Sequence, residues 1–346
     1  MPQGLYTDRP EHLCFKAYDD APLKPEQVRV QTEFAAIKHG TELHVFSGRS
    51  PFQGSRFDGD LRLFVPTDDG GGDGILRRFV GNMVVGRVIE VGAEVTRHKV
   101  GARVYGYGPV AETATLGQHQ AHPLVEPLTP EDVVCLDPAL FAFAAVRDAQ
   151  TCLGDNVVLS GLGAIGLLAI QMLKHSGVMN LIAVDPIAKR RHLAEQYGAT
   201  ATLDPTAGDV GLAVRDILGG VGADVAIEAS GNYRALASAL RSVRMCGRVV
   251  TLGYYKGKDS QLDLGAEWHH NRLELKSSMP DWGNPSREHP LWNRERMQQA
   301  CLELFRNRTL VSQGLIDPIA GFAEADKAFM QVYRNPNDSV KLGVRF

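Results

Sequence analysis

The sequence has few cysteines, little net charge and no long apolar run. Its 346 residues include five scattered cysteines without a C-x-x-C pair, which argues against a disulfide framework or a clustered cysteine site for zinc. The formal net charge is only −3, so nothing indicates binding to nucleic acid or to an anionic membrane. No apolar run approaches the roughly 20 residues needed to span a bilayer. The partner that remains is a small-molecule substrate.

The first residues, Met1-Pro2-Gln3-Gly4-Leu5, lack the basic-then-apolar pattern of a secretory leader. We therefore expect a cytoplasmic protein. Its length is large for one domain and sufficient for two.

Two kinds of pattern divide the chain. Short alternating runs separated by Gly, Pro and Asp indicate a β-rich domain up to residue 137. Between 138 and 279, strand-like and helix-like segments alternate, which predicts an α/β fold with a doubly wound parallel sheet. The expected strands are 157–160, 181–184, 223–228, 249–252 and 273–277, and the expected helices are 165–175, 188–197, 210–218 and 233–243. Residues 280–346 contain two more helix patterns, 294–306 and 323–333, and a strand, 340–344, which we expect to rejoin the β-rich domain.

A glycine turn lies where the first of these strands meets its helix. Residues 161–166 form the pattern G-x-G-x-x-G, which lets the backbone approach a pyrophosphate at a helix N-terminus. Gly161 permits the turn, Gly163 leaves room for phosphate, and Gly166 lets the helix pack closely on the strand. The residues expected to bind the cofactor here are Gly161, Leu162, Gly163, Ala164, Ile165 and Gly166.

An acidic residue follows the next strand. Asp185 lies about 20 residues beyond the glycines, where a carboxylate accepts hydrogen bonds from a ribose 2′-hydroxyl and repels a 2′-phosphate. This predicts NAD. The nearby Arg190 could offset the repulsion, so NADP stays open.

Together these segments resemble the medium-chain dehydrogenase/reductase superfamily. The resemblance covers nearly the whole chain and implies a GroES-like β-rich catalytic domain, a Rossmann domain and an active site in the cleft between them. It also implies a homodimer or homotetramer. The motifs that carry it are Val80-Gly81-x4-Gly86-x-Val88-x2-Val91-Gly92, Val100-Gly101-x-Arg103-Val104, the glycine turn, Gly222–Gly231 and Gly247-Arg248-Val249-Val250.

The positions that bind catalytic zinc in most alcohol dehydrogenases of this superfamily are altered. His39-Gly40-Thr41-Glu42 stands for Cys-x-[Ser/Thr]-[Asp/Glu], Gly81-Asn82-Met83 stands for Gly-His-Glu, and Asp137 matches the third ligand. Only His39 and Asp137 keep ligand chemistry, which is too few for a three-ligand site. The four-cysteine loop of structural zinc is absent. We expect no catalytic or structural zinc, and the chain resembles a zinc-lacking branch that includes bacteriochlorophyllide dehydrogenases and sugar and cyclitol oxidoreductases.

Without a metal, alcohol oxidation needs a side chain that removes the hydroxyl proton. We predict a His39–Asp137 acid/base pair with Thr41 as a proton relay, and Lys38 as the alternative base. A His39 that only fills the vacated metal pocket is equally open.

Other positions follow from the resemblance. The remaining cofactor contacts are expected at Ala229, Ser230, Leu252, Gly253, Ser277 and Ser278. Asn82, His270 and Arg272 are expected to face the substrate, and Glu42 to face the substrate or cofactor, to hold a nearby arginine or to cap a helix.

The sequence thus predicts a zinc-independent, NAD-dependent oxidoreductase. It would interconvert a secondary alcohol and a ketone on a sugar, cyclitol or glycoside. The alternatives are an NADPH-dependent quinone or enoyl reductase and a non-catalytic dinucleotide-binding protein.

Overall fold

The computed structural model describes residues 1–48, 55–66, 77–255, 262–281 and 289–346. It divides into two compact units, which we call the β-rich unit (Met1–Val134 and Ser312–Phe346) and the α/β unit (Cys135–Val311). The chain returns to the β-rich unit at Ser312, whereas the sequence predicted this return at residue 280. Residues 289–311 belong with the α/β unit because α10 (Arg294–Arg306) packs on α4 (Leu136–Ala149) there.

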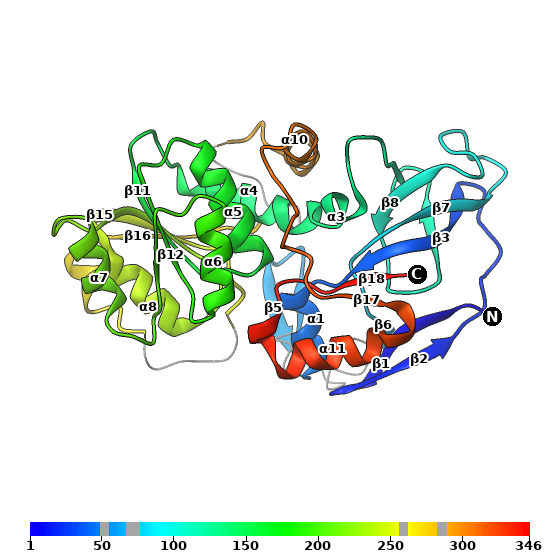
Figure 1. Ribbon diagram of the computed structural model, residues 1–346, viewed down its shortest axis with the longest axis horizontal. Coiled ribbons are helices and arrows are strands. Elements are labelled where there is room, and N and C mark those ends of the chain that lie inside the picture. Colours follow the sequence, from blue (N-terminus) through cyan, green and yellow to red (C-terminus); the bar gives the residue numbers. More distant parts are fainter. Residues whose placement is uncertain (49–54, 67–76, 256–261, 282–288) are drawn as a thin grey trace. The chain divides into compact units, whose positions relative to one another are not determined.

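The α/β unit is built on a parallel sheet. Within the described residues it has six strands in the order β13-β12-β11-β14-β15-β16, so β11 lies at the point where the strand order reverses. Helices α4, α5 and α6 pack along one face, and α7 and α8 pack together on the other (Figure 1). The strands are β11 (Asn156–Ser160), β12 (Asn180–Val184), β13 (Ala201–Leu203), β14 (Ala223–Glu228), β15 (Val243–Thr251) and β16 (Glu274–Ser277), and the helices are α5 (Ala164–His175), α6 (Ala188–Gln196), α7 (Val210–Ile217), α8 (Tyr233–Ser242) and α9 (Glu267–His270).

The predicted alternation of strands and helices is confirmed. The sequence missed α4 and β13, and β15 begins six residues earlier than expected. The interiors of β11 and β12 are fully apolar and buried, as expected for strands covered on both faces. Strand β14 is buried apart from Asp224, which is partly exposed.

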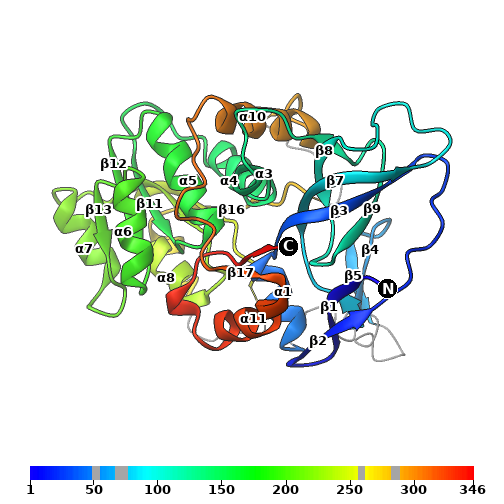
Figure 2. The same cartoon turned by 45° about the vertical axis from the view of Figure 1, so that its right-hand side comes forward.

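The β-rich unit contains three sheets in its described residues. The largest is ordered β10-β8-β7-β3-β18-β17, with β9 also paired to β3; β2-β1-β6 and the hairpin β4-β5 are smaller. Figure 2 shows α11 beside β1 and β2, whose apolar side chains share one core with it. The strands are β1 (Gln3–Arg9), β2 (His12–Ala17), β3 (Gln27–Ala36), β4 (Ser55–Asp58), β5 (Leu63–Pro66), β6 (Arg78–Phe79), β7 (Met83–Val91), β8 (Arg103–Tyr107), β9 (Thr113–Gly117), β10 (His122–Pro123), β17 (Ile319–Gly321) and β18 (Gly343–Arg345), and the helices are α1 (His39–Phe46), α3 (Pro130–Val133) and α11 (Ala325–Arg334).

The returning strand predicted at 340–344 is confirmed in kind. Strand β18 pairs antiparallel with β3, where Gly343 lies opposite Ala36. The chain therefore brings its last residues to the end of β3, directly before α1. That junction holds most of the candidate catalytic residues.

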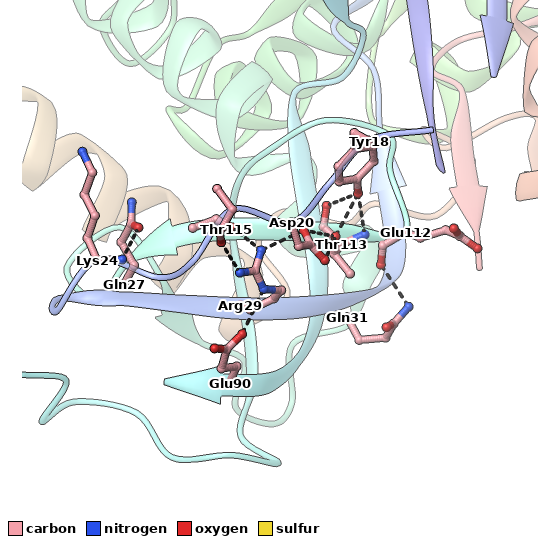
Figure 3. A network of polar contacts seen from close by, with 11 residues as sticks. Tyr18, Asp20, Lys24, Gln27, Arg29, Gln31, Glu90, Glu112, Thr113 and Thr115 are labelled. Carbon is pink, nitrogen blue, oxygen red and sulfur yellow. Dashed lines mark hydrogen bonds and ion pairs between the residues drawn. The ribbon is translucent and has the colours of Figure 1, made fainter. Parts of the chain in front are cut away.

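A buried arginine ties the segment after β2 to the large sheet (Figure 3). The Arg29 side chain is only 6% exposed and pairs with Asp20 (Nη1–Oδ1 2.7 Å) and Glu90 (Nε–Oε2 3.1 Å). It also donates to Thr115 Oγ1 and to the carbonyl of Ala21. The network anchors the crossing from β2 to β3.

Replacing Arg29 with Met is expected to lower the free energy of unfolding by about 2 kcal/mol, because the sheet loses the charge-assisted hydrogen bonds that the buried guanidinium donates. Urea denaturation measures the change. Arg56→Met is the matched control, since the Arg56–Asp58 pair has an arginine that is 65% exposed and exposed pairs contribute about 1 kcal/mol or less. Equal losses in both variants would contradict a structural role for the Arg29 network.

Candidate active site

The glycine turn has the geometry that the sequence predicted. Strand β11 ends at Ser160, and α5 begins at Ala164 with Gly163 as its N-cap. Gly161 has φ 91°, which disfavours other residues, and a Cβ on Gly166 would lie 1.9 Å from the carbonyl oxygen of Gly161. A Cβ on Gly163 would meet nothing within 4 Å. The space in front of the α5 N-terminus is therefore open to a ligand.

Asp185 faces this turn. Its carboxylate is buried and accepts the backbone N–H of Leu162 (2.7 Å, Oδ2) and of Ile187 (2.8 Å, Oδ1). Each carboxylate oxygen retains a second lone pair. Burial lowers the pKa of the nearby Arg190 guanidinium, and the charge of Asp185 raises it. Arg191 is engaged elsewhere, with the carbonyl of Asp185 and with Asp204.

Glu228, the last residue of β14, organises the neighbouring loop. Its carboxylate is fully buried and accepts the backbone N–H of Ser230 (2.8 Å) and Gly231 (3.1 Å), and the hydroxyls of Ser230 and Tyr255. Burial raises the pKa of Glu228, and these hydrogen bonds oppose the shift. Glu228 lies within the motif Gly222–Gly231, but the sequence alone predicted no role for it. A buried acid directly after an apolar strand was the available signal.

The same carboxyl-end edge contains the other predicted cofactor contacts. Backbone N–H groups of Leu252 and Gly253 donate to the carbonyl of Glu228, and that of Ala229 donates to Ser160. The hydroxyls of Ser160 and Ser278 are buried and have no hydrogen-bond partner among the described residues, whereas Ser277 is exposed. Orphaned hydroxyls at the carboxyl-end edge of the sheet, Ser160 next to the open N-terminus of α5 and Ser278 after β16, fit a polar ligand such as a dinucleotide.

In the β-rich unit, three segments that are distant in sequence meet. The end of β3 pairs with the starts of β7 and β18, as Ala36 lies opposite both Met83 and Gly343. The backbone N–H of Asn82 donates to Ala36 O (3.0 Å), and buried Lys341 donates its ammonium to Ile37 O (2.5 Å). Lys341 was not anticipated, because nothing in the sequence brings it near residue 37.

The side chain of His39 accepts a backbone hydrogen bond across this junction. The N–H of Leu342 donates to Nε2 of His39 at 2.9 Å. Nε2 is thus an acceptor, and the neutral ring carries its proton on Nδ1. A proton at Nε2 would break this bond. In this arrangement His39 can donate a hydrogen bond from Nδ1, but it has no nitrogen ready to accept a proton from a substrate.

Glu42 lies on the buried side of α1. It pairs with Arg78 (Oε1–Nη2 2.6 Å). Of the roles predicted for Glu42 from the sequence, this contact supports the one in which it holds a nearby arginine. Burial raises its pKa to about 7, against the lowering effects of Arg78, the Gly81 backbone and Lys38. Arg78 was not anticipated from the sequence.

The raised pKa of Glu42 makes stability depend on pH. The folded protein holds this proton more tightly than the unfolded chain, so the contribution is present below pH 4.5 and is lost as pH rises through about 7. Glu42→Gln should remove this loss, on the order of 2–3 kcal/mol. Urea denaturation at pH 5 and pH 8 tests this, with the exposed Glu26→Gln as control. Parallel pH dependence in wild type and Glu42→Gln would contradict it.

The predicted partners of His39 are distributed between the two units. Thr41 is exposed in the first turn of α1, and half-buried Lys38 is its N-cap residue. Asp137 is buried at the start of α4 and belongs to the α/β unit. The His39–Asp137 pair therefore stays a prediction.

The substrate positions predicted near α9 are at the surface of the α/β unit. His270 is exposed, and its Nδ1 lies 3.0 Å from the carbonyl oxygen of Gly265 and 3.1 Å from that of Ala266. Arg272 is exposed and has φ 52°. Their role in substrate binding stays a prediction.

The side chains at the positions of the catalytic zinc ligands are poor donors for that metal. Throughout the part of the chain that the structure describes, no three His, Cys, Asp or Glu side chains gather as a metal site would require. One nitrogen of His39 already accepts a backbone N–H, and Asn82 and Met83 are poor zinc donors. The residues present do not fit a three-ligand catalytic zinc.

In the described residues, no helix has the length and apolar character needed to cross a membrane.

Comparison with known proteins places the chain in a family. Residues 164–291 match the family described as zinc-binding dehydrogenase. The D-guloside 3-dehydrogenase of Escherichia coli (strain K12) is 38% identical over 348 residues, which cover 99% of each chain.

Solved structures share the fold. An alcohol dehydrogenase from Escherichia coli CFT073 complexed with NADH has a TM-score of 0.78 at 18% identity, covering 100% of this chain and 99% of that one. An NADP-bound protein from Sinorhizobium meliloti 1021, described as a zinc-binding dehydrogenase, has a TM-score of 0.76 at 22% identity, with the same coverage. The chain belongs to the zinc-binding dehydrogenase family of the medium-chain dehydrogenase/reductase superfamily and is an oxidoreductase that acts on CH–OH groups.

Proposed function

We propose that the protein oxidises a secondary hydroxyl of a sugar, cyclitol or glycoside to a ketone, with NAD as the cofactor and without catalytic zinc. The observation that carries the substrate class is the 38% identity, along the whole chain, to a relative named D-guloside 3-dehydrogenase. The altered zinc positions carry the metal independence. A cytoplasmic location and a homodimer or homotetramer remain parts of this proposal.

The α/β unit would hold the dinucleotide. The open N-terminus of α5 suits the pyrophosphate, and Asp185 suits the adenosine ribose hydroxyls. Bound NAD supplies a nicotinamide ring that accepts hydride. Because Arg191 is already engaged with Asp204, a 2′-phosphate would rely on Lys189 and Arg190 against the charge of Asp185. We therefore favour NAD over NADP.

The β-rich unit would hold the substrate hydroxyl and move its proton. His39 is proposed to donate a hydrogen bond from Nδ1 to the substrate oxygen, which leaves proton removal to another group. Lys38 is the adjacent candidate for the base. Thr41, exposed one turn away, would connect that proton to solvent.

Steady-state assays with NAD and NADP, on gulosides, free polyols and 2-butanol, test the proposal. We expect reduction of NAD with a glycoside or polyol, and weaker turnover with NADP. Elemental analysis should find less than one zinc per chain, and a chelator should leave the rate unchanged. One tightly held zinc per chain would overturn the metal-independent mechanism. Reduction of quinones by NADPH, without alcohol oxidation, would favour a quinone or enoyl reductase instead.

A further inference from the structure

A cavity of about 490 Å³ opens in the α/β unit away from the glycine turn. It is lined by the last turns of α4 and α5, by Leu304 of α10 and by the segments that follow these helices. The helix α5 begins at Ala164 and first lines this cavity at Met172, eight residues later. At 1.5 Å per residue the two sites are roughly 12 Å apart. The cavity is therefore distinct from the proposed cofactor site.

The charge in the cavity is one-sided. Arg147, His175 and His289 line it, and no acidic residue does so among the described residues. The chain as a whole has more acidic than basic residues, so this cluster of basic groups is not a reflection of composition. Asp148, the nearest acidic neighbour in sequence, pairs with Lys276 instead (3.3 Å).

The Arg147 guanidinium has a buried nitrogen that no described residue satisfies. Its Nε is buried and has no hydrogen-bond partner in the described chain. The group stacks on the ring of Trp292 at 4.1 Å, and Arg296 stacks on the same ring at 4.0 Å. The two guanidinium groups repel each other, and burial together with Arg296 lowers the pKa of Arg147, against the raising effect of the Asp148 charge. An unpaired donor next to a second cation makes an anion the ligand that would best complete the site.

The rest of the lining fits an organic anion better than a bare ion. Phe143, Met172 and Leu304 supply apolar surface, and Thr309 and Ser176 supply hydroxyls. Helix carboxyl ends disfavour anions, but Arg248 caps the end of α4 by donating to the carbonyl of Ala149. We propose that this cavity binds a small organic oxyanion, a carboxylate or a phosphate monoester with an apolar group, through the Arg147 guanidinium.

Two exposed cysteines provide an internal test. Cys152 lines the cavity, whereas Cys246 at the start of β15 does not. Alkylation of each thiol by iodoacetamide is followed by mass spectrometry on the full chain with saturating NAD. The probes are benzoate and phenyl phosphate, with benzyl alcohol as the neutral control. Both oxyanions, or one of them, should slow labelling of Cys152 by about 10-fold or more relative to Cys246.

The variant Arg147→Met should abolish this protection, and Arg147→Lys should retain part of it. Arg306→Met, an arginine of α10 paired with Glu303 outside the cavity, should behave as wild type. Labelling of buried Cys135 and Cys301 reports unfolding, in which case Arg147→Gln replaces the methionine variant. Absence of protection, equal protection by benzyl alcohol, or protection that survives in Arg147→Met or Arg147→Gln would overturn the proposal.

Discussion

Replacing Gly163 with Asp is expected to weaken NAD binding by 100-fold or more while leaving the fold intact. A Cβ at this position meets nothing within 4 Å, so the protein itself can accommodate the side chain. Asp is a favourable N-cap residue and would stabilise the start of α5. The same carboxylate would fill and charge the space proposed for the pyrophosphate, and each 1.4 kcal/mol of lost affinity is tenfold.

Cofactor affinity is measured by quenching of protein fluorescence on titration with NADH, and stability by thermal unfolding of the free protein. The matched control is Gly208→Asp, another α/β-unit glycine whose Cβ would meet nothing within 4 Å. It should keep wild-type affinity. Unchanged NADH affinity in Gly163→Asp would place the cofactor elsewhere.

Replacing Lys38 with Met is expected to lower kcat by about 10²–10⁴-fold, which is the usual contribution of an acid/base group. His39→Gln should cost less, about 10-fold to 100-fold, because it removes a hydrogen-bond donor to the substrate oxygen. Glutamine can still accept the N–H of Leu342 through its amide oxygen, so the junction between β3 and β18 is preserved.

The pH profile of kcat distinguishes the two roles. The wild type should gain activity as pH rises along a limb that Lys38→Met lacks and His39→Gln keeps. NADH affinity should change little in either variant. The opposite order of losses, with the limb absent from His39→Gln, would restore the base role predicted for His39 from the sequence.

The α/β half was predictable because its signals are local. Apolar strands buried on both faces, helices of regular period and a glycine turn with a following acid each occupy a short window. The sequence pattern did not predict the helix α4, although eight of its 14 residues are buried. Its run of alanines and phenylalanines gives little contrast between faces, and Pro138 lies within its first turn. The strand β13 has three partly buried residues, too few for a periodic pattern.

The candidate catalytic residues were identified by sequence, but their chemistry was not. The base role of His39 followed from its place in a motif. What limits that role is a backbone N–H from Leu342, 303 residues away. The pKa of Glu42 likewise depends on burial, which raises it, and on Arg78 of the distant strand β6, which lowers it.

The sequence by itself determined the family, the two folds and the glycine turn with its acid, because each is encoded in residues close together along the chain. Only the tertiary structure decided which nitrogen of His39 is engaged, how Glu42 titrates, and that the Nε of Arg147 is buried beside a cavity without a partner among the described residues. Hydrogen bonding, desolvation and charge depend on which distant segments meet, and strand pairing and helix packing fix those meetings.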